Sequence, residues 1–545
     1  MNELEIKKRL EALKTERSNI EHVWELVEQF CVPFRGEFFR DETSESSVDW
    51  RMRDVYDSTA IMAVQTLASS IHGSLTSPSF QWFDFRFRDD ELNTKAEYKK
   101  WLQEATRRTY FALQDSNFNL EANECYTDIA SFGNSVIVEE MEGDELDGNT
   151  NIVFNAIPLK EAYFEEDHKG KICNFYRCLS WTSIKLREKF GEENLPDYVK
   201  ADLDSERAGI KKYDVIFCIY KRKDAKDVDT SKILSPEARP YGYKYIMAKD
   251  CSLLQTGGYY EMPAFIPRWR RNTSSKWGHS PAMASLPDIL TLNELVELTL
   301  RSLEKVVDPA IMTTERGLLS DLDLASGGLT VVRSKEDVWP FESRARFDVA
   351  DLQTEKLRSS IRSAFYVDQL ELKESPAMTA TEVQVRYELM QRLLGPTLGR
   401  LESDFLSPML ERTFMMLLRA GKLPDLPEGL QNAELDIQYV GPLTSAQKID
   451  QAAKAERWLQ NMGGIAQIDP SVLDIIDIDA IARGLADTLN IDAKYIRSSE
   501  KVNAIRKQRQ QQQQEMMQLE QAKMAGDAGQ SVGKAAQLMG GGENA

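Results

Sequence analysis

The sequence predicts an α+β protein, and two observations, given with the chain length, support this class. Apolar residues recur at helical spacing near the N-terminus and again after residue 286. Between about residues 134 and 271 the chain instead carries short β-branched and aromatic runs, such as Asp214–Tyr220, separated by turn clusters such as Asp147–Asn149. The chain has 545 residues, which is enough for roughly three or four ordinary domains. We therefore expect helices on both sides of a mostly antiparallel sheet region.

The helices that precede and interrupt the sheet region follow from apolar stripes. An amphipathic helix is expected to open the protein, because Leu10, Leu13 and Trp24 share one helical face. The second stripe should break at Gly73, which is followed by loop-type residues. The predicted helical ranges are 3–30, 57–75, 94–115, 120–132 and, as an insertion in the sheet region, 182–204.

A strong helix is predicted over residues 286–307. Ser285 can cap it, Pro287 would stand in its first turn and Asp288 would complement its dipole. Its packing stripe consists of Ile289, Leu292, Leu295, Val296 and Leu303, with Val306 continuing it. An irregular segment bearing Gly and Pro follows over 308–350, and a second helix is predicted over about 351–366. Two helices flanking a small module indicate a stalk with a structure at its tip.

A long kinked helix is predicted to begin at a capping box. Thr379 is the expected N-cap and Glu382 the N3 residue, and together they contribute about 1 kcal/mol to fixing the helix start. Gly395 and Pro396 should bend this helix without ending it. Pro408 should start another helix, closed by Gly421, and Leu435–Val440 has strand character.

The C-terminal region is predicted to be helical and then to lose regular structure. Residues 444–500 show a helical pattern, broken at Asp469–Pro470 and Asn490. The tail contains a run of glutamines and then many glycines. We expect an exposed or oligomer-dependent helix over 501–524 and disorder over 526–545.

Composition excludes several classes of function. Lys and Arg total 68 and Asp and Glu total 87, so the formal net charge is −19, which argues against a protein that wraps free nucleic acid by neutralising phosphates. No secretion signal and no run of 18 apolar residues occurs, so we expect synthesis in the cytoplasm and no membrane association. Six cysteines without a CxxC pair are expected to be reduced, buried thiols, and four dispersed histidines argue against a metal site or a histidine-based triad. No cofactor is expected.

Four features of the sequence bear on possible chemistry. No phosphate-binding glycine loop is present, so the chain alone is not expected to be an ATP-driven motor. Asp474, Asp477 and Asp479 could suggest a two-metal nuclease, but they lie close together in one segment, and a solvated face is the better interpretation. The cluster Pro267–Arg271 with Lys276–Trp277 could grip phosphate or stack on a base, although packed tryptophans and paired arginines are favoured. His279 is expected to be a packed loop residue.

Three stretches of the chain belong together: Leu75–Ser79 with Trp82–Phe83; Trp277–Met283 with Leu286–Ile289 and Leu292–Asn293; and Met378–Val383 with Leu394–Pro396, Gly399–Leu401 and Arg419–Pro424. Together they resemble the portal, or head-to-tail connector, proteins of short-tailed bacteriophages. Their order and spacing span about residues 10 to 500. The family usually carries a basic residue at the place of His279.

The resemblance implies a portal fold: an elongated subunit, assembled as a ring of roughly twelve copies around a DNA channel. The implied parts are a wing (1–285), stem helix 1 (286–307), a clip (308–350), stem helix 2 (351–366), a tunnel loop (367–379), a kinked helix returning to the wing (380–443), a crown (444–500) and a tail (501–545). Burying six aliphatic side chains of the first stem helix against neighbours would contribute on the order of 10 kcal/mol before entropy costs.

The expected function is a non-enzymatic portal at one capsid vertex. The ring would pass double-stranded DNA during packaging and ejection, dock the large subunit of the terminase motor and then join tail adaptor proteins, with the crown and tail facing capsid, scaffolding or internal core proteins. In the tunnel loop, Asp368, Glu371 and Glu374 outnumber Lys373, which favours a constriction that does not adhere to DNA. Two alternatives remain open: a nucleic-acid-processing enzyme, and another oligomeric virion adaptor without a DNA channel.

Overall fold

The protein is described by a computed structural model that divides it into two compact units. Unit 1 comprises Met1–Trp82 and Arg108–Leu423, and unit 2 comprises Phe83–Arg107 and Pro424–Ala545. The described residues are 1–35, 54–78, 81–142, 151–203, 209–222, 234–272, 275–315, 317–323, 330–340, 347–370, 394–425, 427, 435–439, 457–463, 504–516 and a few single positions between 479 and 502. The secondary structure is mixed α and β, as the sequence predicts.

The largest sheet of unit 1 has five strands in sequential antiparallel order. They are β4 (Ala162–Glu166), β5 (Ile172–Thr182), β6 (Lys212–Lys221), β7 (Tyr241–Met247) and β8 (Leu253–Tyr259). Two short helices, α7 (Ser183–Phe190) and α8 (Asp197–Leu203), lie between β5 and β6. Both the antiparallel sheet and its helical insertion are therefore confirmed.

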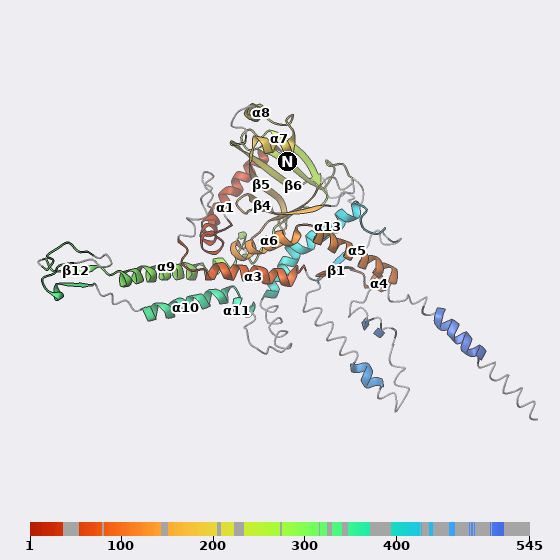
Figure 1. The fold of residues 1–545 in the computed structure, drawn as a ribbon. Helices are drawn as coiled ribbons and strands as arrows, with labels where there is room; N and C mark the ends of the chain where they lie inside the picture. The colour runs from red at the N-terminus through yellow and green to blue at the C-terminus, as the bar shows by residue number, and fades with distance from the viewer. Residues whose placement is uncertain are drawn as a thin grey trace, which may run out of the picture. The chain divides into compact units, whose positions relative to one another are not determined.

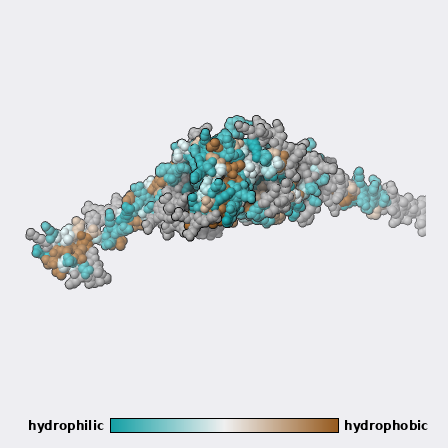
Figure 2. Space-filling view, turned by 90° about the horizontal axis from the view of Figure 1, so that it is seen from above, coloured by the Kyte–Doolittle hydropathy of each residue, from teal (hydrophilic) through white to brown (hydrophobic). Residues whose placement is uncertain are grey.

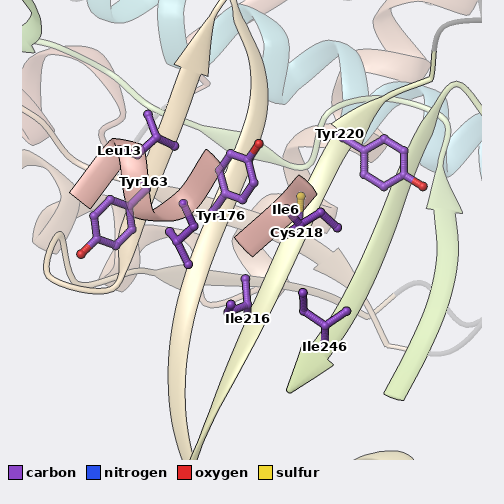
Figure 3. Packing of buried hydrophobic residues seen from close by; sticks show 9 residues of the cluster. Ile6, Leu13, Tyr163, Tyr176, Ile216, Cys218, Tyr220 and Ile246 are labelled. Carbon is purple, nitrogen blue, oxygen red and sulfur yellow. The ribbon is translucent and has the colours of Figure 1, made fainter. Parts of the chain in front are cut away.

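Helix α1 (Glu3–Cys31) covers one face of this sheet (Figure 3). Its residues Ile6, Leu10 and Leu13 pack against a set of sheet residues that alternate along their strands: Tyr163, Tyr176, Ile216, Cys218, Tyr220 and Ile246. This alternation places every second strand residue toward the helix. The predicted helix over 3–30 is confirmed.

A buried arginine fastens α1 to the start of β4. Arg17 donates hydrogen bonds to the carbonyl oxygens of Leu159 (2.7 Å), Lys160 (3.0 Å) and Ala162 (3.0 Å), and its Nε bonds the Glu21 carboxylate at 2.6 Å. The guanidinium also stacks on the Tyr163 ring at 3.8 Å. Three backbone acceptors thus depend on one side chain.

A second, three-stranded sheet has the order β3–β2–β9, formed by Ile152–Ala156, Ile137–Met141 and Ala264–Phe265. Helix α6 (Phe118–Phe132) ends beside it, and Trp24 of α1 donates from Nε1 to the Phe132 carbonyl oxygen at 3.1 Å. Gly133 ends α6 with a φ of +78°, and a Cβ there would meet the Gly278 carbonyl oxygen at 2.6 Å. Glycine is required because the two backbones approach so closely.

Helix α6 also carries a buried carboxylate. Asp128 accepts a hydrogen bond from Arg35 Nη2 at 2.7 Å, just after the end of α1. Burial raises the pKa of Asp128 to about 6, and the Arg35 charge offsets only part of that effect.

The predicted helix near 57–75 is α3 (Thr59–Leu75), but the predicted break at Gly73 is wrong.

Two further helices, α9 (Pro281–Val307) and α10 (Phe347–Ala364), lie side by side and contact each other (Figure 1). The predicted cap at Ser285 is also wrong. Ser280 caps α9 by accepting from Met283 N at 3.0 Å, and Pro281 stands in the first turn. The serine cap followed by proline therefore occurs five residues earlier than predicted. Pro287 lies inside the helix.

The described residues between α9 and α10 are more regular than predicted. Strands β12 (Ile311–Thr313) and β13 (Val338–Pro340) pair antiparallel, and Leu318 and Val332 form an isolated bridge. After α10, the helical turn α11 (Val367–Leu370) occupies the start of the segment predicted to be a loop. Because Val367 is buried, the chain stays attached to the body there.

One helical run extends from residue 394 through α13 (Ser407–Arg419), with a π-helical turn at Glu402–Leu406. The predicted separate start at Pro408 is therefore wrong. Gly395 and Pro396 lie in a regular α-helical stretch, and the departure from α-helical geometry is the π-helical turn at Glu402–Leu406. Arg419 binds Glu261 with two hydrogen bonds of 2.7 and 2.8 Å, which anchors the end of α13. Gly421 ends the run with a φ of +66°, as predicted.

Unit 2 contains a two-stranded ribbon. Strand β1 (Phe83–Phe87) pairs antiparallel with β14 (Leu435–Tyr439), which confirms the strand predicted near 435. Helix α4 (Asp90–Thr94) follows β1, and α5 (Ala96–Asp115) begins in unit 2. The Phe87 and Trp101 rings stack at 6.4 Å. Residues 504–516 are helical, and all of them except the half-buried Ile505 are exposed. Among the described residues, no helix combines the length and apolar character needed to cross a membrane.

Candidate functional site

The α9–α10 pair is the candidate functional site, because burial along α9 stops halfway. In its first half, apolar residues such as Ala282, Ile289 and Leu292 are buried within the chain. Asn293 is the last buried residue of α9. Beyond it, five apolar residues are between 39% and 82% exposed: Leu298, Leu300, Leu303, Val306 and Val307.

Four of the five exposed residues, Leu300, Leu303, Val306 and Val307, continue the buried stripe, whereas Leu298 lies on the other side of the helix. Leu292, Val296, Leu303 and Val307 are separated by four, seven and four residues, which keeps them on one helical face. The opposite side carries the charged residues Glu294, Glu297, Arg301, Glu304 and Lys305. The apolar stripe of α9 therefore outlasts the part of the chain that covers it.

Helix α10 turns one face to α9 and leaves apolar residues on another. Thr354 and Ile361, seven residues apart, are its buried residues, and Ser360 Oγ donates to Asp288 Oδ2 of α9 at 2.8 Å. Val349 and Leu352 are 52% and 62% exposed. Their spacing from Thr354 places them away from the buried face. Two apolar surfaces of the helix pair thus remain open.

The segment between α9 and α10, residues 308–346, is here called the tip, and its described part lacks a hydrophobic core. Among its described residues between 308 and 340, no hydrophobic side chain is buried. Exposed apolar residues include Met312, Leu319, Leu322, Val331 and Trp339. Figure 2 shows apolar residues gathered at this outer end of the projecting helix pair. Since a two-stranded ribbon is marginally stable alone, contact with another chain would stabilise it.

The structure divides the five predicted stem-packing residues. Ile289 and Leu292 are buried within their own chain, so they are not available to a neighbouring molecule. Leu295 and Val296 are half-buried, and Leu303 is exposed. Leu298 and Leu300 lie outside the predicted set of surface residues, although Leu300 is apolar and lies beside the stripe.

The predicted channel residues are only partly described. Asp368 is exposed in α11, and Ser363 Oγ donates to its Oδ2 at 3.2 Å, so it stands on a helical turn and not in a loop. Glu371, Lys373 and Glu374 lie outside the described residues, as do Thr379 and Glu382 of the capping box.

The basic and aromatic cluster near residue 270 is a packing feature, as the favoured interpretation held. Arg268 is buried and forms an ion pair with Glu166. The Trp277 ring meets Trp24 edge-on at 5.1 Å, and Lys276 pairs with Glu16 at 2.7 Å. These partners leave the cluster poorly suited to bind phosphate. His279, in contrast, is exposed, so the prediction that it is a packed loop residue is wrong.

The carboxylates considered for a nuclease gain no support. Asp479 binds Arg506 through two hydrogen bonds of 2.6 and 2.7 Å, while Asp474 and Asp477 lie outside the described residues. In the described part of the chain, no group of three His, Cys, Asp or Glu side chains is placed to hold a metal ion.

The six cysteines are free thiols. Burial raises the pKa of the Cys31 and Cys125 thiols to about 12, whereas Cys173, Cys178 and Cys251 are only half-buried.

Comparison with known proteins places this chain among phage proteins. The sequence profile of the family described as "Bacteriophage head to tail connecting protein" matches residues 3–496. The chain is 27% identical over 513 residues to the "Probable portal protein" of Bordetella phage BPP-1, covering 91% of this chain and 89% of that protein. It is 25% identical over 512 residues to the "Portal protein" of Salmonella phage epsilon15, covering 92% and 90%.

Among solved structures, one similar chain comes from the "Virion of native gene transfer agent (GTA) particle". The identity is 10%, the TM-score is 0.36, and the match covers 74% of this chain and 87% of that chain. A chain from the "Neck of empty GTA particle computed with C6 symmetry" gives a TM-score of 0.37 at 10% identity, with coverage of 74% and 88%.

Proposed function

Because this chain belongs to the family of bacteriophage head-to-tail connecting proteins, we propose that its copies form a ring at one capsid vertex and enclose the genome's channel. As a portal or connector protein, it is a structural component of the virion and not an enzyme. The finer proposal concerns how copies meet, what passes between them and what they dock.

The uncovered apolar stripe of α9 carries the ring proposal. Leu300, Leu303 and Val307 share one face of α9 and are exposed in the single chain, and soluble proteins rarely leave such a continuous apolar stripe uncovered. In a closed ring, each copy presents one surface to the copy before it and another to the copy after it. The exposed face of α9 would meet the outer face of the next copy's α10, where Val349 and Leu352 lie. Residues 286–307 and 351–366 would then form the stem, and we expect roughly twelve copies.

The channel is proposed to let DNA slide. The chain has a net charge of −19, and Asp368, Glu371 and Glu374 outnumber Lys373 in the segment proposed as the tunnel loop. Acidic walls repel phosphates, so double-stranded DNA would meet few deep binding minima and could move in both directions. Scattered lysines and arginines would be enough for weak, salt-dependent contacts.

The docking surfaces are proposed from their place along the chain. The clip, residues 308–350, would dock the terminase large subunit during packaging and tail adaptor proteins afterwards. Support comes from the exposed apolar residues of the tip, such as Leu319 and Trp339, where no hydrophobic side chain among the described residues from 308 to 340 is buried. The crown (444–500) and tail (501–545) would face the capsid interior, with its capsid, scaffolding or internal core proteins.

End-on electron micrographs and native mass spectrometry of the purified protein test the ring. We expect a closed ring with a central channel. A stable monomer at micromolar concentration would contradict the proposal, and a ring without an axial opening would favour an oligomeric adaptor that does not conduct DNA.

The tunnel-loop role needs a separate experiment. Deleting residues 371–377 spares buried Val367, so ring assembly should persist while DNA packaging or retention falls. A variant that replaces the same seven residues with a Gly/Ser chain of equal length controls for the altered length. Normal packaging by both variants would exclude a role for this segment.

A further inference from the structure

A short segment of chain, Asp54–Ser58, contacts both α9 and α10 and joins them to the rest of unit 1, here called the body. We name these five residues the strap. On α9, the side chain of Asn293 binds the strap backbone twice: Oδ1 accepts from Tyr56 N at 2.7 Å, and Nδ2 donates to the Asp54 carbonyl oxygen at 2.8 Å. An amide that both accepts and donates fixes the strap in position and direction along α9.

The strap holds α10 through an ion pair. Arg358 donates from Nε (3.0 Å) and Nη2 (2.8 Å) to Asp57 Oδ2. The other carboxylate oxygen of Asp57 accepts from Thr59 N at 2.9 Å, at the first residue of α3. Since the Asp57 side chain is only 6% exposed, this charge-assisted contact is shielded from water.

The ionised form of Asp57 is the one that the site favours. Burial by itself would raise the pKa of the Asp57 carboxyl, but the hydrogen bonds from Thr59 and Arg358 outweigh burial, so its pKa lies below the ordinary value. The pair is therefore charged at neutral pH.

The position of the strap along the helices is what makes it informative. Asn293 is the last buried residue of α9, and no residue of α9 after it is buried. On α10, Arg358 lies between the two buried residues, Thr354 and Ile361. The strap thus crosses the pair at the level where α9 leaves the body, which is where a change in direction would have the largest effect at the far end.

We propose that Asp57, Arg358 and Asn293 are positioning residues that fix the angle between the α9–α10 pair and the body, and thereby fix the number of copies in the ring. This inference rests on the proposed ring function. In a closed ring the rotation between neighbours is a full turn divided by the copy number, so rings of twelve and thirteen copies differ by only about 2° per contact. When both the body and the helix pair touch the neighbours, the angle between these two parts decides which rotation satisfies both contacts.

Asp57→Asn and Asn293→Ala test this role. Asp57→Asn keeps an acceptor for Thr59 N but removes the charge that Arg358 needs, and Asn293→Ala removes both bonds to the strap backbone. We expect native mass spectrometry to show either several copy numbers or a shifted one, where the unaltered protein gives one. Arg358→Lys keeps the positive charge opposite Asp57, so this variant should keep a single predominant copy number, which shows that the effect of Asp57→Asn comes from losing the ion pair.

The matched control is Arg301→Gln, which breaks the exposed Glu297–Arg301 pair (2.5 Å) on the same helix without touching the strap. It should leave the copy number unchanged. A single, unaltered copy number in both strap variants would overturn the inference while leaving the ring itself intact. Complete loss of rings in variants that remain folded by circular dichroism would also overturn it, and absence of rings in the unaltered protein would instead contradict the proposed function.

Discussion

Placing a charge on the open face of α9 is the sharpest test of how copies meet. Leu303→Glu changes a residue that is 39% exposed in the single chain, so the glutamate can reach water there and the fold should be kept. In a ring, the same carboxylate would be covered by the neighbouring copy. The variant should therefore fold as a monomer and assemble only at much higher concentration.

The magnitude follows from the exposure of the stripe. Full burial of a Leu or Val side chain contributes about 2 kcal/mol. Leu300, Leu303, Val306 and Val307 share one face of α9 and are between 39% and 82% exposed, so covering them would stabilise each contact between neighbours by about 4 kcal/mol. Replacing Leu303 removes about 1 kcal/mol of this and adds the cost of desolvating a carboxylate, for a total of about 3 kcal/mol per contact. Each contact should weaken by roughly 100-fold.

Light scattering during size-exclusion chromatography over a concentration series measures the effect. The control is Leu120→Glu on α6, which introduces the same charge at a residue that is 74% exposed and outside the helix pair. We expect assembly of the control at the concentration of the unaltered protein and assembly of Leu303→Glu only at much higher concentration. Identical assembly of the two variants would refute the assignment of α9 to the interface.

Three further predictions concern the buried polar contacts of unit 1. Arg17→Met should lower the free energy of unfolding by about 3 kcal/mol in urea titrations, because three backbone carbonyl oxygens lose their donor. Asp128, with a pKa of about 6, contributes stability that is present at acid pH and lost as pH rises through that value. Relative to Asp128→Asn, the unaltered protein should therefore lose about 1 kcal/mol between about pH 5 and pH 7, and equal pH profiles would contradict this. Glu261→Gln should weaken both bonds to Arg419 and raise amide hydrogen exchange in α13, without changing exchange in α1.

Much of the fold could be predicted from local sequence patterns. The stripe of α1, the β-branched runs of the sheet and Gly421 after α13 each report on a few consecutive residues, so their signals survive without knowledge of the rest of the chain. Boundaries were less predictable. Ser280 and Ser285 offer nearly the same cap signal, and what distinguishes them is the bond from Ser280 Oγ to the Ser131 carbonyl oxygen at 2.6 Å, which no local pattern contains.

The candidate site was predictable only in part, for a similar reason. Periodicity identifies Leu292 and Leu303 as members of one stripe, but it cannot say that the chain covers the first and leaves the second open. The π-turn at Glu402–Leu406 had no evident signal. The strap was missed because Asp57 and Arg358 are separated by about three hundred residues, and an ion pair of that kind has no spacing to recognise.

The sequence by itself determined the α+β class, the helix pair with its intervening segment, the acidic balance and the resemblance to portal proteins. These properties depend on composition and on spacings within a few turns or strands. Only the tertiary structure decided which half of the α9 stripe is buried, how Arg268 is neutralised by Glu166, and where the strap crosses the helices. Burial and pairing depend on residues distant in the chain, so they become known when the chain is folded.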